Sequence, residues 1–147
     1  MRGKDSTAVK VTYRFPQTDA RWDITYKVYS NGVIKVNNHF VAENAQAPMI
    51  PRVGLRMQLP ARITSLAYYG RGPEENYRDR RTSQFFGEYT SDIKDMYEPY
   101  VRPQENNHRT DIYWCTLTSK AKEGLLFVAD RTFEMNVSNY PCLLYTS

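Results

Sequence analysis

Long apolar runs are missing from this sequence. No window of its 147 residues approaches the roughly 18 consecutive apolar residues that a membrane-spanning helix needs. The opening stretch, MRGKDSTAVK, also has no apolar core of the kind that a secretory signal requires. The sequence therefore predicts a soluble chain with no membrane partner.

Cysteine and histidine are scarce. The cysteines are Cys115 and Cys142, and the histidines are His39 and His108. These positions form neither a disulfide framework nor a CxxC motif, and the histidines lie too far from the cysteines in sequence to suggest a zinc cluster. We expect no metal site and no cofactor in this chain.

Charge is not concentrated in runs of one sign. The 20 lysines and arginines and the 16 aspartates and glutamates are interspersed, and the formal net charge is +4. No stripe resembles the basic footprint of a phosphate-binding surface, so we expect no nucleic-acid partner.

What is present is the composition of a globular, strand-rich chain. Apolar residues make up 41% and aromatic residues 14%, including 12 tyrosines, and aromatic residues favour strands. The length amounts to one domain or less. Apolar patterns predict strands over residues 9–15, 22–28, 34–40, 53–59, 66–69, 113–117, 125–129 and 133–137.

Two of the later segments allow more detailed predictions. The continuous apolar run over residues 125–129 predicts a strand that is buried on both faces. Ser91 is placed to cap a short helical turn that runs through Met96. Because strands recur at regular spacing and helical periodicity is almost absent, we predict an all-β, sandwich-like antiparallel fold.

The hairpin around Asn31-Gly32 has a register that the sequence can predict. A two-residue loop would place apolar residues opposite polar ones on the same face, with Val28 facing Lys35. A three-residue loop over residues 30–32, closed by a left-handed Gly32, instead pairs Val28 with Ile34, Tyr26 with Val36, and Trp22 with Phe40. We predict the longer loop.

Two segments are dense in charge. The first charged segment, GRGPEENYRDR, runs from Gly70 to Arg80, and the second, PYVRPQENNHRTD, runs from Pro99 to Asp111. Glu74 and Glu75 could be reactive carboxylates, but a glycosidase pair must flank the scissile bond from two sides, and sequence neighbours usually point apart. We therefore favour a structural role, in which Glu74, Glu75 and Asp79 pair with Arg71, Arg78, Arg80 or Arg81 or accept hydrogen bonds from loop amides.

A reactive role and a structural role are also the two alternatives for the second charged segment. His108 could act as an acid or base, but no serine or cysteine with nucleophile character stands near it in sequence, so a hydrogen-bonding role is favoured. Aromatic residues beside both segments could stack on sugar rings or could close the edges of the core; they are Tyr68, Tyr69, Tyr77, Tyr97 and Tyr100.

Three stretches carry a resemblance to a known family. PRVGLRMQLP, YYGRGPEENYRDR and DMYEPYVRPQENNHRTDIYW resemble, in order and spacing, the C-terminal small-chain region of glycoside hydrolase family 2 β-galactosidases. The resemblance extends from about Val9 to Tyr140. It implies an antiparallel β-supersandwich of the galactose-mutarotase-like type, in agreement with the strands read from periodicity.

The resemblance also implies an activity for a longer parent enzyme. That enzyme would hydrolyse terminal β-D-galactosides such as lactose by a retaining mechanism, with two glutamates on an N-terminal TIM barrel and a divalent cation such as Mg²⁺. No residue of this chain matches those glutamates, so the chain is expected to be noncatalytic and inactive alone. Its expected partners are other domains of the same polypeptide in a homo-oligomer, and the compartment stays open between bacterial cytoplasm and periplasm.

Within this reading, the candidate residues fall into two sets. The possible rim of the sugar pocket comprises Tyr77, Tyr100 and His108. The structural charged loops, which would hold the two charged segments against each other and against neighbouring domains, comprise Arg71, Glu74, Glu75, Asp79, Arg80, Arg102, Glu105, Arg109 and Asp111. The alternatives are a stand-alone carbohydrate-binding or mutarotase-like module, and an interaction domain with no sugar contact.

The end of the sequence departs from the family pattern. After Pro141 the chain continues as CLLYTS, which matches the translation of a sequencing adapter, so we expect residues 1–141 to be a partial small-chain domain and residues 142–147 to be a non-native tail. A supersandwich that is incomplete at its C-terminus would leave strand edges open, and we expect the isolated chain to aggregate.

Overall fold

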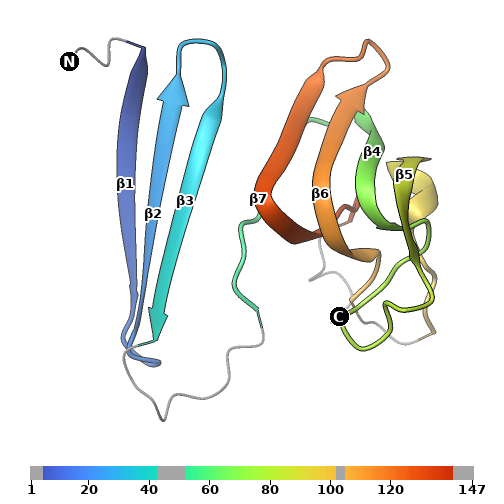
Figure 1. The fold of residues 1–147 in the computed structure, drawn as a ribbon, viewed down its shortest axis with the longest axis horizontal. Coiled ribbons are helices and arrows are strands. Elements are labelled where there is room, and N and C mark those ends of the chain that lie inside the picture. Colours follow the sequence, from blue (N-terminus) through green and yellow to red (C-terminus); the bar gives the residue numbers. More distant parts are fainter. Residues whose placement is uncertain (1–4, 43–51, 102–104, 141–147) are drawn as a thin grey trace. The chain divides into compact units, whose positions relative to one another are not determined.

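The computed structural model describes residues 5–42, 52–101 and 105–140. The chain divides into two compact units, an N-terminal unit (Met1–Arg56) and a C-terminal unit (Met57–Ser147), each built on one sheet (Figure 1). Every strand pair is antiparallel, and the helical element of the described residues is one short 3-10 turn. The prediction of an antiparallel all-β fold is confirmed.

The N-terminal unit is a three-stranded meander. Its strands are β1 (Ser6–Phe15), β2 (Ala20–Tyr29) and β3 (Ile34–Ala42), in the order β1-β2-β3. The hairpin between β2 and β3 has the predicted register, with Trp22 opposite Phe40 and Val28 opposite Ile34. Gly32 has a φ of 86°, a conformation that glycine adopts without steric cost, so the prediction of the three-residue loop is confirmed.

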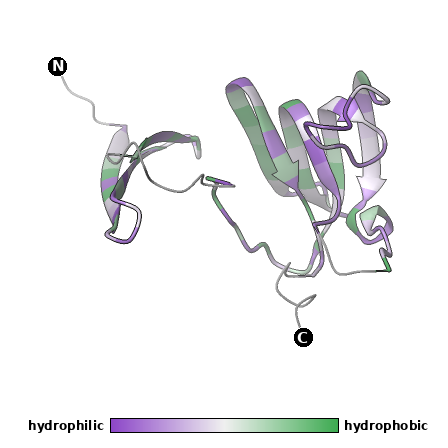
Figure 2. Ribbon diagram, turned by 90° about the horizontal axis from the view of Figure 1, so that it is seen from below, coloured by the Kyte–Doolittle hydropathy of each residue, from purple (hydrophilic) through white to green (hydrophobic). Residues whose placement is uncertain are grey.

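One face of this sheet is largely apolar. Side chains alternate between faces along a strand, so the paired rows Val9-Tyr26-Val36 and Tyr13-Trp22-Phe40 share a face. Figure 2 colours the ribbon by hydropathy and shows that both sheets contain hydrophobic and hydrophilic positions. Several members of this face remain exposed, namely Val9, Tyr13, Phe15, Val28 and Ile34. A three-stranded sheet with an exposed apolar face needs a covering layer to be stable.

The C-terminal unit is a four-stranded sheet with the order β5-β4-β6-β7. Its elements are β4 (Ile63–Gly72), β5 (Phe85–Asp92), the 3-10 turn η1 (Ile93–Met96), β6 (His108–Ser119) and β7 (Gly124–Asn136). The core lies on one face of this sheet, where η1 contributes Ile93 and Met96. The sheet contributes Leu66, Tyr68, Ile112, Cys115, Leu117 and Met135.

The predicted strand over residues 53–59 is wrong. Val53, Leu55 and Met57 alternate with polar residues as in a strand, yet all three are exposed and no ladder forms in this stretch. A strand requires a neighbour to pair its backbone groups, and no described strand pairs with this segment. Pro60 follows directly and has no backbone N–H to donate.

Predictions for β5 and β7 also need correction. Residues 125–129 are not buried on both faces, because Leu126 and Val128 are 63% and 69% exposed on the last strand of the sheet. This run and residues 133–137 were predicted as separate strands, but a single strand, β7, spans Gly124–Asn136. Ser91 does not cap the helical turn: it lies in β5, and Asp92 occupies the cap position without a side-chain hydrogen bond.

Candidate functional site

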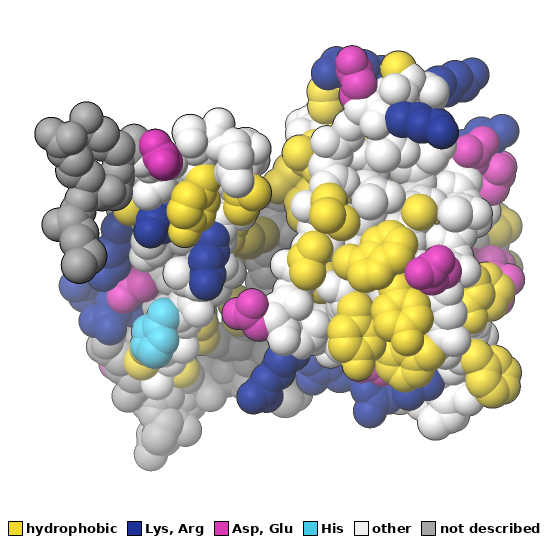
Figure 3. All heavy atoms as spheres, turned by 45° about the horizontal axis from the view of Figure 1, so that its top comes forward, with side chains coloured by type: hydrophobic (Ala, Val, Ile, Leu, Met, Phe, Trp, Pro, Cys, Tyr) yellow, Lys and Arg dark blue, Asp and Glu magenta, His cyan; other side chains and the backbone are white. Residues whose placement is uncertain are grey.

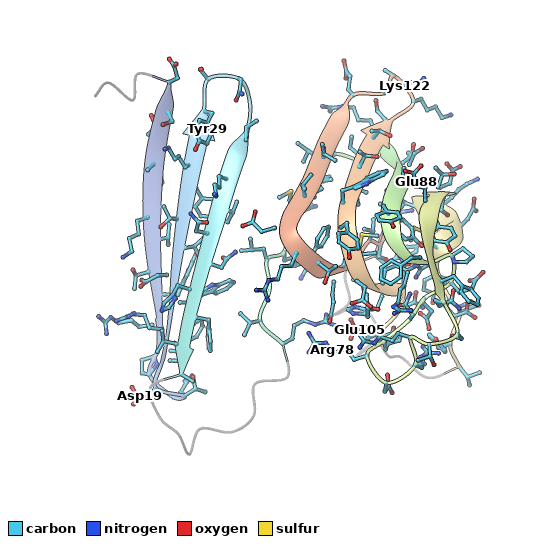
Figure 4. All side chains as sticks on the ribbon, viewed as in Figure 1. Asp19, Tyr29, Arg78, Glu88, Glu105 and Lys122 are labelled. Atoms are coloured by element: carbon cyan, nitrogen blue, oxygen red, sulfur yellow. The ribbon has the colours of Figure 1, made fainter. Side chains whose placement is uncertain are left out.

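The two charged segments meet at one end of the C-terminal sheet, and we call the place where they meet the charged junction. Gly70, Arg71 and Gly72 still belong to β4, and the rest of the first charged segment leaves the strand as a loop. The second charged segment ends inside β6. Arg78 and Glu105, one from each segment, are labelled in Figure 4. The backbone N–H of Asn76 donates a 2.8 Å hydrogen bond to the His108 carbonyl, so the first loop is joined directly to the start of β6.

Asn76 is the most completely bonded side chain of this junction. It is fully buried, and its Oδ1 accepts hydrogen bonds from the backbone N–H and the hydroxyl of Thr110. Its Nδ2 donates to the carbonyl oxygens of Arg71 and Glu74, each at 3.2 Å. One amide side chain thus provides the donors and acceptors that a loop without a ladder partner lacks.

Glu75 is the charged centre of the junction. Its Oε2 accepts a 2.8 Å hydrogen bond from the backbone N–H of Asn107, and its Oε1 accepts from Arg80 Nη2 and from the Tyr100 hydroxyl. The Glu75 side chain is only 11% exposed, whereas that of Arg80 is 52% exposed. Glu75 therefore connects the loop after β4 with two parts of the second charged segment.

Asp111 forms a second centre. Its carboxylate accepts a 2.7 Å hydrogen bond from Arg71 Nε and lies 3.3 Å from Arg81 Nη1. The register between β6 and β7 shifts between Arg109 and Ile112, and Asp111 has a φ of 57° within this irregular stretch. A bulge of this kind turns a side chain away from the regular alternation. Here the carboxylate faces the two arginines.

His108 lies buried between two carboxylates. Its Nδ1 is 3.3 Å from Glu105 Oε1, and its Nε2 is 3.2 Å from Glu134 Oε2 on β7. The ring of Tyr77 stacks on the imidazole, with centroids 5.1 Å apart and planes at 16°. The other oxygen of Glu134 accepts a 2.6 Å hydrogen bond from Arg78 Nε. The histidine thus joins β6 and β7 under the first loop.

The pKa of Tyr77 reflects these surroundings. Burial raises its pKa to about 12, and the nearby carboxylates Glu75 and Glu105 act in the same direction. The hydroxyl donates a 3.0 Å hydrogen bond to the Glu105 carbonyl, and the Arg80 guanidinium lies 4.6 Å from the ring centroid. Tyr77 is therefore a neutral hydrogen-bond donor within the junction.

The structure brings most of the residues predicted from the sequence together, but not all of them. It brings together Arg71, Glu75, Arg80, Glu105 and Asp111 with the rim candidates Tyr77, Tyr100 and His108, whose polar groups face other protein atoms. Glu74 and Asp79 are exposed and form no ion pair with any described residue. Arg102 lies outside the described residues.

Three residues of the junction were not among the residues predicted from the sequence. Asn76, Asn107 and Thr110 are all buried, and together they connect the two charged segments through amide and hydroxyl hydrogen bonds. Asparagine is common in loops because its side chain bonds to backbone groups, so a search for asparagine within the charged segments could have singled out Asn76 and Asn107, but not Thr110.

A cleft of about 180 Å³ opens beside this junction. It is lined from β4, β5, η1 and the two charged segments, and includes Tyr68, Glu74, Glu75, Tyr89, Glu98 and Arg109. Arg109 is 5% exposed, and its Nε donates to the Tyr68 hydroxyl at 3.3 Å. Burial raises the pKa of Tyr68, while Arg109 opposes that rise.

The described residues offer no site that fits a divalent cation. Nowhere in residues 5–42, 52–101 and 105–140 do three or more His, Cys, Asp or Glu side chains gather in a group that could hold a metal ion.

The buried thiol of Cys115 has its pKa raised to about 12 by desolvation. Across the same described part, no helix is long and apolar enough to cross a membrane.

Comparison with known proteins decides the family. Residues 1–142 match the family model described as the beta galactosidase small chain. The chain belongs to the β-galactosidase small chain family. The resemblance read from the three sequence stretches is thereby confirmed.

Curated relatives of this family member are β-galactosidases. The β-galactosidase of Priestia megaterium is 33% identical over 136 residues, which cover 92% of this chain and 13% of the relative. That of Lactobacillus delbrueckii subsp. bulgaricus is 34% identical over 139 residues, which cover 94% of this chain and 13% of the relative. The chain thus spans about 13% of the length of these relatives.

Proposed function

We propose that this chain is a noncatalytic segment of a larger β-galactosidase, in which it supplies scaffold and borders the sugar pocket. The parent enzyme would hydrolyse terminal β-D-galactosides such as lactose. The observation that carries the proposal is the family match over residues 1–142, combined with relatives named β-galactosidase that are far longer than the chain. The catalytic glutamates and any Mg²⁺ would belong to the rest of that polypeptide.

The use of carboxylates in the charged junction supports a structural role. Glu75, Asp111 and Glu134 each accept a hydrogen bond from an arginine. A glycosidase needs two carboxyl groups that face each other across the scissile bond at about 5 to 10 Å, with access to the substrate. Carboxylates that are occupied by arginines and loop amides hold loops in place instead.

An exposed aromatic cluster supports packing against another domain. Tyr69, Phe86 and Tyr113 project from three adjacent strands, with ring centroids 5.4 to 6.4 Å apart, and each side chain is at least 36% exposed. The Arg71 guanidinium lies 4.6 Å from the Phe86 ring. Figure 3 shows apolar side chains gathered on the surface of the C-terminal unit. Aromatic and arginine side chains of this kind are typical of buried interfaces.

The occupant we propose for this cluster is another domain of the same polypeptide. The relatives have most of their length outside the matched region, so such a domain is available in proteins of this family. The supersandwich fold and a homo-oligomeric parent, both implied by the family resemblance, are part of the same proposal. Tyr77, Tyr100 and His108 would lie near the rim of the sugar pocket.

The decisive experiment compares the 147-residue chain with the longer gene product from which it derives. Both proteins would be assayed for hydrolysis of lactose and of a nitrophenyl β-galactoside. We expect turnover from the longer protein alone. Hydrolysis by the purified 147-residue chain would overturn the noncatalytic assignment, as would a gene with an authentic start and no hydrolase domain upstream.

A second candidate is a stand-alone carbohydrate-binding or mutarotase-like module. The observation that favours it is the cleft beside the charged junction, which combines tyrosines with carboxylates and an arginine. Titration of the chain with galactose separates this candidate from an interaction domain without sugar contact, and optical rotation of the sugar would reveal mutarotation.

A further inference from the structure

One face of the N-terminal sheet concentrates basic side chains that are interspersed in the sequence. Side chains alternate between the two faces of a strand, so the register of β1, β2 and β3 gathers these residues on the face opposite the apolar one. We call it the basic face, and its lysines and arginines are Lys10, Arg14, Arg21, Lys27 and Lys35. In β1–β3, which the structure describes in full, the acidic residue of this face is Asp23. The excess of four positive charges equals the formal net charge of the whole chain, +4, so the rest of the chain is balanced.

Two pairs of like charges lie directly opposite each other on the basic face. Lys27 of β2 is paired with Lys35 of β3. Arg14 of β1 is paired with Arg21 of β2. The Cβ atoms of directly opposed residues are about 5 Å apart, so like charges at these positions repel each other and destabilise the sheet. An anionic group over each pair would reverse this cost, so the two pairs point to an anionic partner.

The acidic residue between the two pairs selects the kind of anion. Arg21 and Lys27 are six residues apart on β2, which separates the pairs by about 20 Å, and Asp23 lies between them. A 2.5 Å hydrogen bond from the Thr12 hydroxyl and the charges of Lys10 and Arg21 lower the pKa of Asp23, so its carboxylate is ionised at neutral pH. A continuous phosphate backbone that reached both pairs would pass over this carboxylate, whereas two separate carboxylates on a folded protein would not.

The distribution of aromatic rings also argues against a nucleic acid. Proteins that bind single strands stack the bases on aromatic side chains within a basic groove. The aromatic residues of this sheet lie mainly on the apolar face, namely Tyr13, Phe15, Trp22, Tyr26 and Phe40. Tyr29 is on the basic face, where its ring centroid lies 5.1 Å from Lys27 Nζ. Carboxylates of a folded domain therefore fit the basic face better than a polynucleotide does.

We propose that the basic face docks on an acidic surface of another domain of the same polypeptide, with a carboxylate of that surface over each pair of like charges. The inference rests on the proposed function and adds to it a second docking surface, which is charged and belongs to the N-terminal unit. The relatives have most of their length outside the matched region, so such a domain is available in proteins of this family.

The test measures the effect of one charge reversal in two proteins. In the 147-residue chain, Lys27→Glu replaces a like-charge pair with an opposite-charge pair, so we expect the urea midpoint of unfolding to rise by about 0.1 to 0.5 M. In the longer gene product the same change sets a carboxylate against the acidic surface, so we expect the melting temperature to fall by about 2 °C or more. Shifts in the same direction in both proteins, or an unchanged melting temperature of the longer one, would overturn the proposal.

Further variants separate docking from repulsion within the sheet. Lys35→Glu should have the same two effects as Lys27→Glu. The double variant restores a like-charge pair, so the midpoint of the 147-residue chain should return close to its original value, while the melting temperature of the longer protein falls below that of either single variant. Lys120→Glu, in the exposed loop between β6 and β7, is the control and should shift neither protein. A double variant of the longer protein that is as stable as the single variants would contradict docking.

A labelled single-stranded DNA of about 20 nucleotides tests the alternative anion by fluorescence anisotropy. At about 0.15 M salt we expect no saturable binding to the 147-residue chain, and saturable binding that Lys27→Glu weakens would overturn the assignment of a protein partner. The proposed function fails separately, because it is lost if the longer gene product does not hydrolyse β-galactosides, whereas the stability shifts involve no hydrolysis.

Discussion

The side-chain oxygen of Asn76 accepts two hydrogen bonds from Thr110, one from the backbone N–H at 3.0 Å and one from the hydroxyl at 2.6 Å. This contact ties the loop after β4 to β6 through groups that carry no charge. Asn76 directly follows Glu75 and Thr110 directly precedes Asp111, so each partner of this neutral, buried contact is the sequence neighbour of a charged centre. The neutral contact holds the loop under conditions in which salt weakens the exposed ion pairs.

Replacement of Asn76 by alanine should destabilise the C-terminal unit strongly. The change removes four side-chain hydrogen bonds, two from the buried N–H and hydroxyl of Thr110 and two to the carbonyl oxygens of Arg71 and Glu74. We expect a loss of about 2 to 4 kcal/mol in the free energy of unfolding, measured by urea denaturation. Asn37→Ala, at an exposed position of β3, is the control. Equal effects of the two changes would show that the Asn76 bonds contribute little.

Glu75 and Arg80 should contribute unequally although they pair with each other. Glu75→Ala leaves the buried N–H of Asn107 and the Tyr100 hydroxyl without their carboxylate acceptor. We expect it to lower the free energy of unfolding by about 2 to 4 kcal/mol. Arg80 is half-exposed, so Arg80→Ala should cost no more than about 1 kcal/mol.

In the parent enzyme proposed above, the same two variants test whether the role of the junction is structural. Both variants should lower the melting temperature, Glu75→Ala more than Arg80→Ala. Both should leave kcat for a nitrophenyl β-galactoside near the value of the unsubstituted enzyme. The outcome that contradicts us is a large loss of turnover at an unchanged melting temperature.

Local interactions made the N-terminal hairpin predictable from the sequence. The alternation of Trp22, Tyr26 and Val28 with polar residues, together with a glycine at the turn, leaves one register that keeps apolar side chains on one face. The segment over residues 53–59 has an equally clear alternation and forms no strand. Alternation describes the side chains, whereas a strand also depends on a neighbour that the pattern does not reveal.

The charged junction was only partly predictable for the same reason. Dense opposite charge in both segments indicated arginine-carboxylate pairs, but the partner of each arginine depends on tertiary structure. Arg78 pairs with Glu134, which is 56 residues away on β7, while neighbouring Asp79 pairs with no described residue. The bulge that turns Asp111 toward Arg71 has no counterpart in the periodicity of the sequence.

Gly70 should not tolerate a side chain. A Cβ at this position would lie 2.4 Å from Ile112 Cδ1 and 3.0 Å from both the Asp111 carbonyl oxygen and the Ile112 Cα. Ile112 is fully buried and is paired with Phe133 of β7, so it has little room to shift. We expect Gly70→Ala to cost roughly 1 to 3 kcal/mol, as other overpacked sites do. Gly54→Ala is the matched control because no atom lies within 4 Å of its added Cβ. Thermal unfolding followed by circular dichroism compares the two, and a Gly70→Ala protein as stable as the control would contradict the close approach of β4 and β6.

Tyr77 should make the stability of the protein fall at alkaline pH. Burial raises its pKa to about 12 in the folded chain, whereas tyrosine in an unfolded chain has a pKa of about 10. Between these values the folded state keeps a proton that the unfolded state has lost, so the free energy of unfolding decreases as pH rises from 10 to 12, and the contribution is complete below pH 10. The full effect of such a difference is at most roughly 2 to 3 kcal/mol.

In Tyr77→Phe this titration is absent, while that of the buried Cys115 thiol is common to both proteins and cancels. We therefore expect the stability difference between the unmodified chain and Tyr77→Phe, measured by urea denaturation at several pH values, to shift in favour of the variant across this window. A difference that is independent of pH, or a phenolate absorbance titration of Tyr77 near its ordinary value, would show that the stacked ring on His108 is not desolvated.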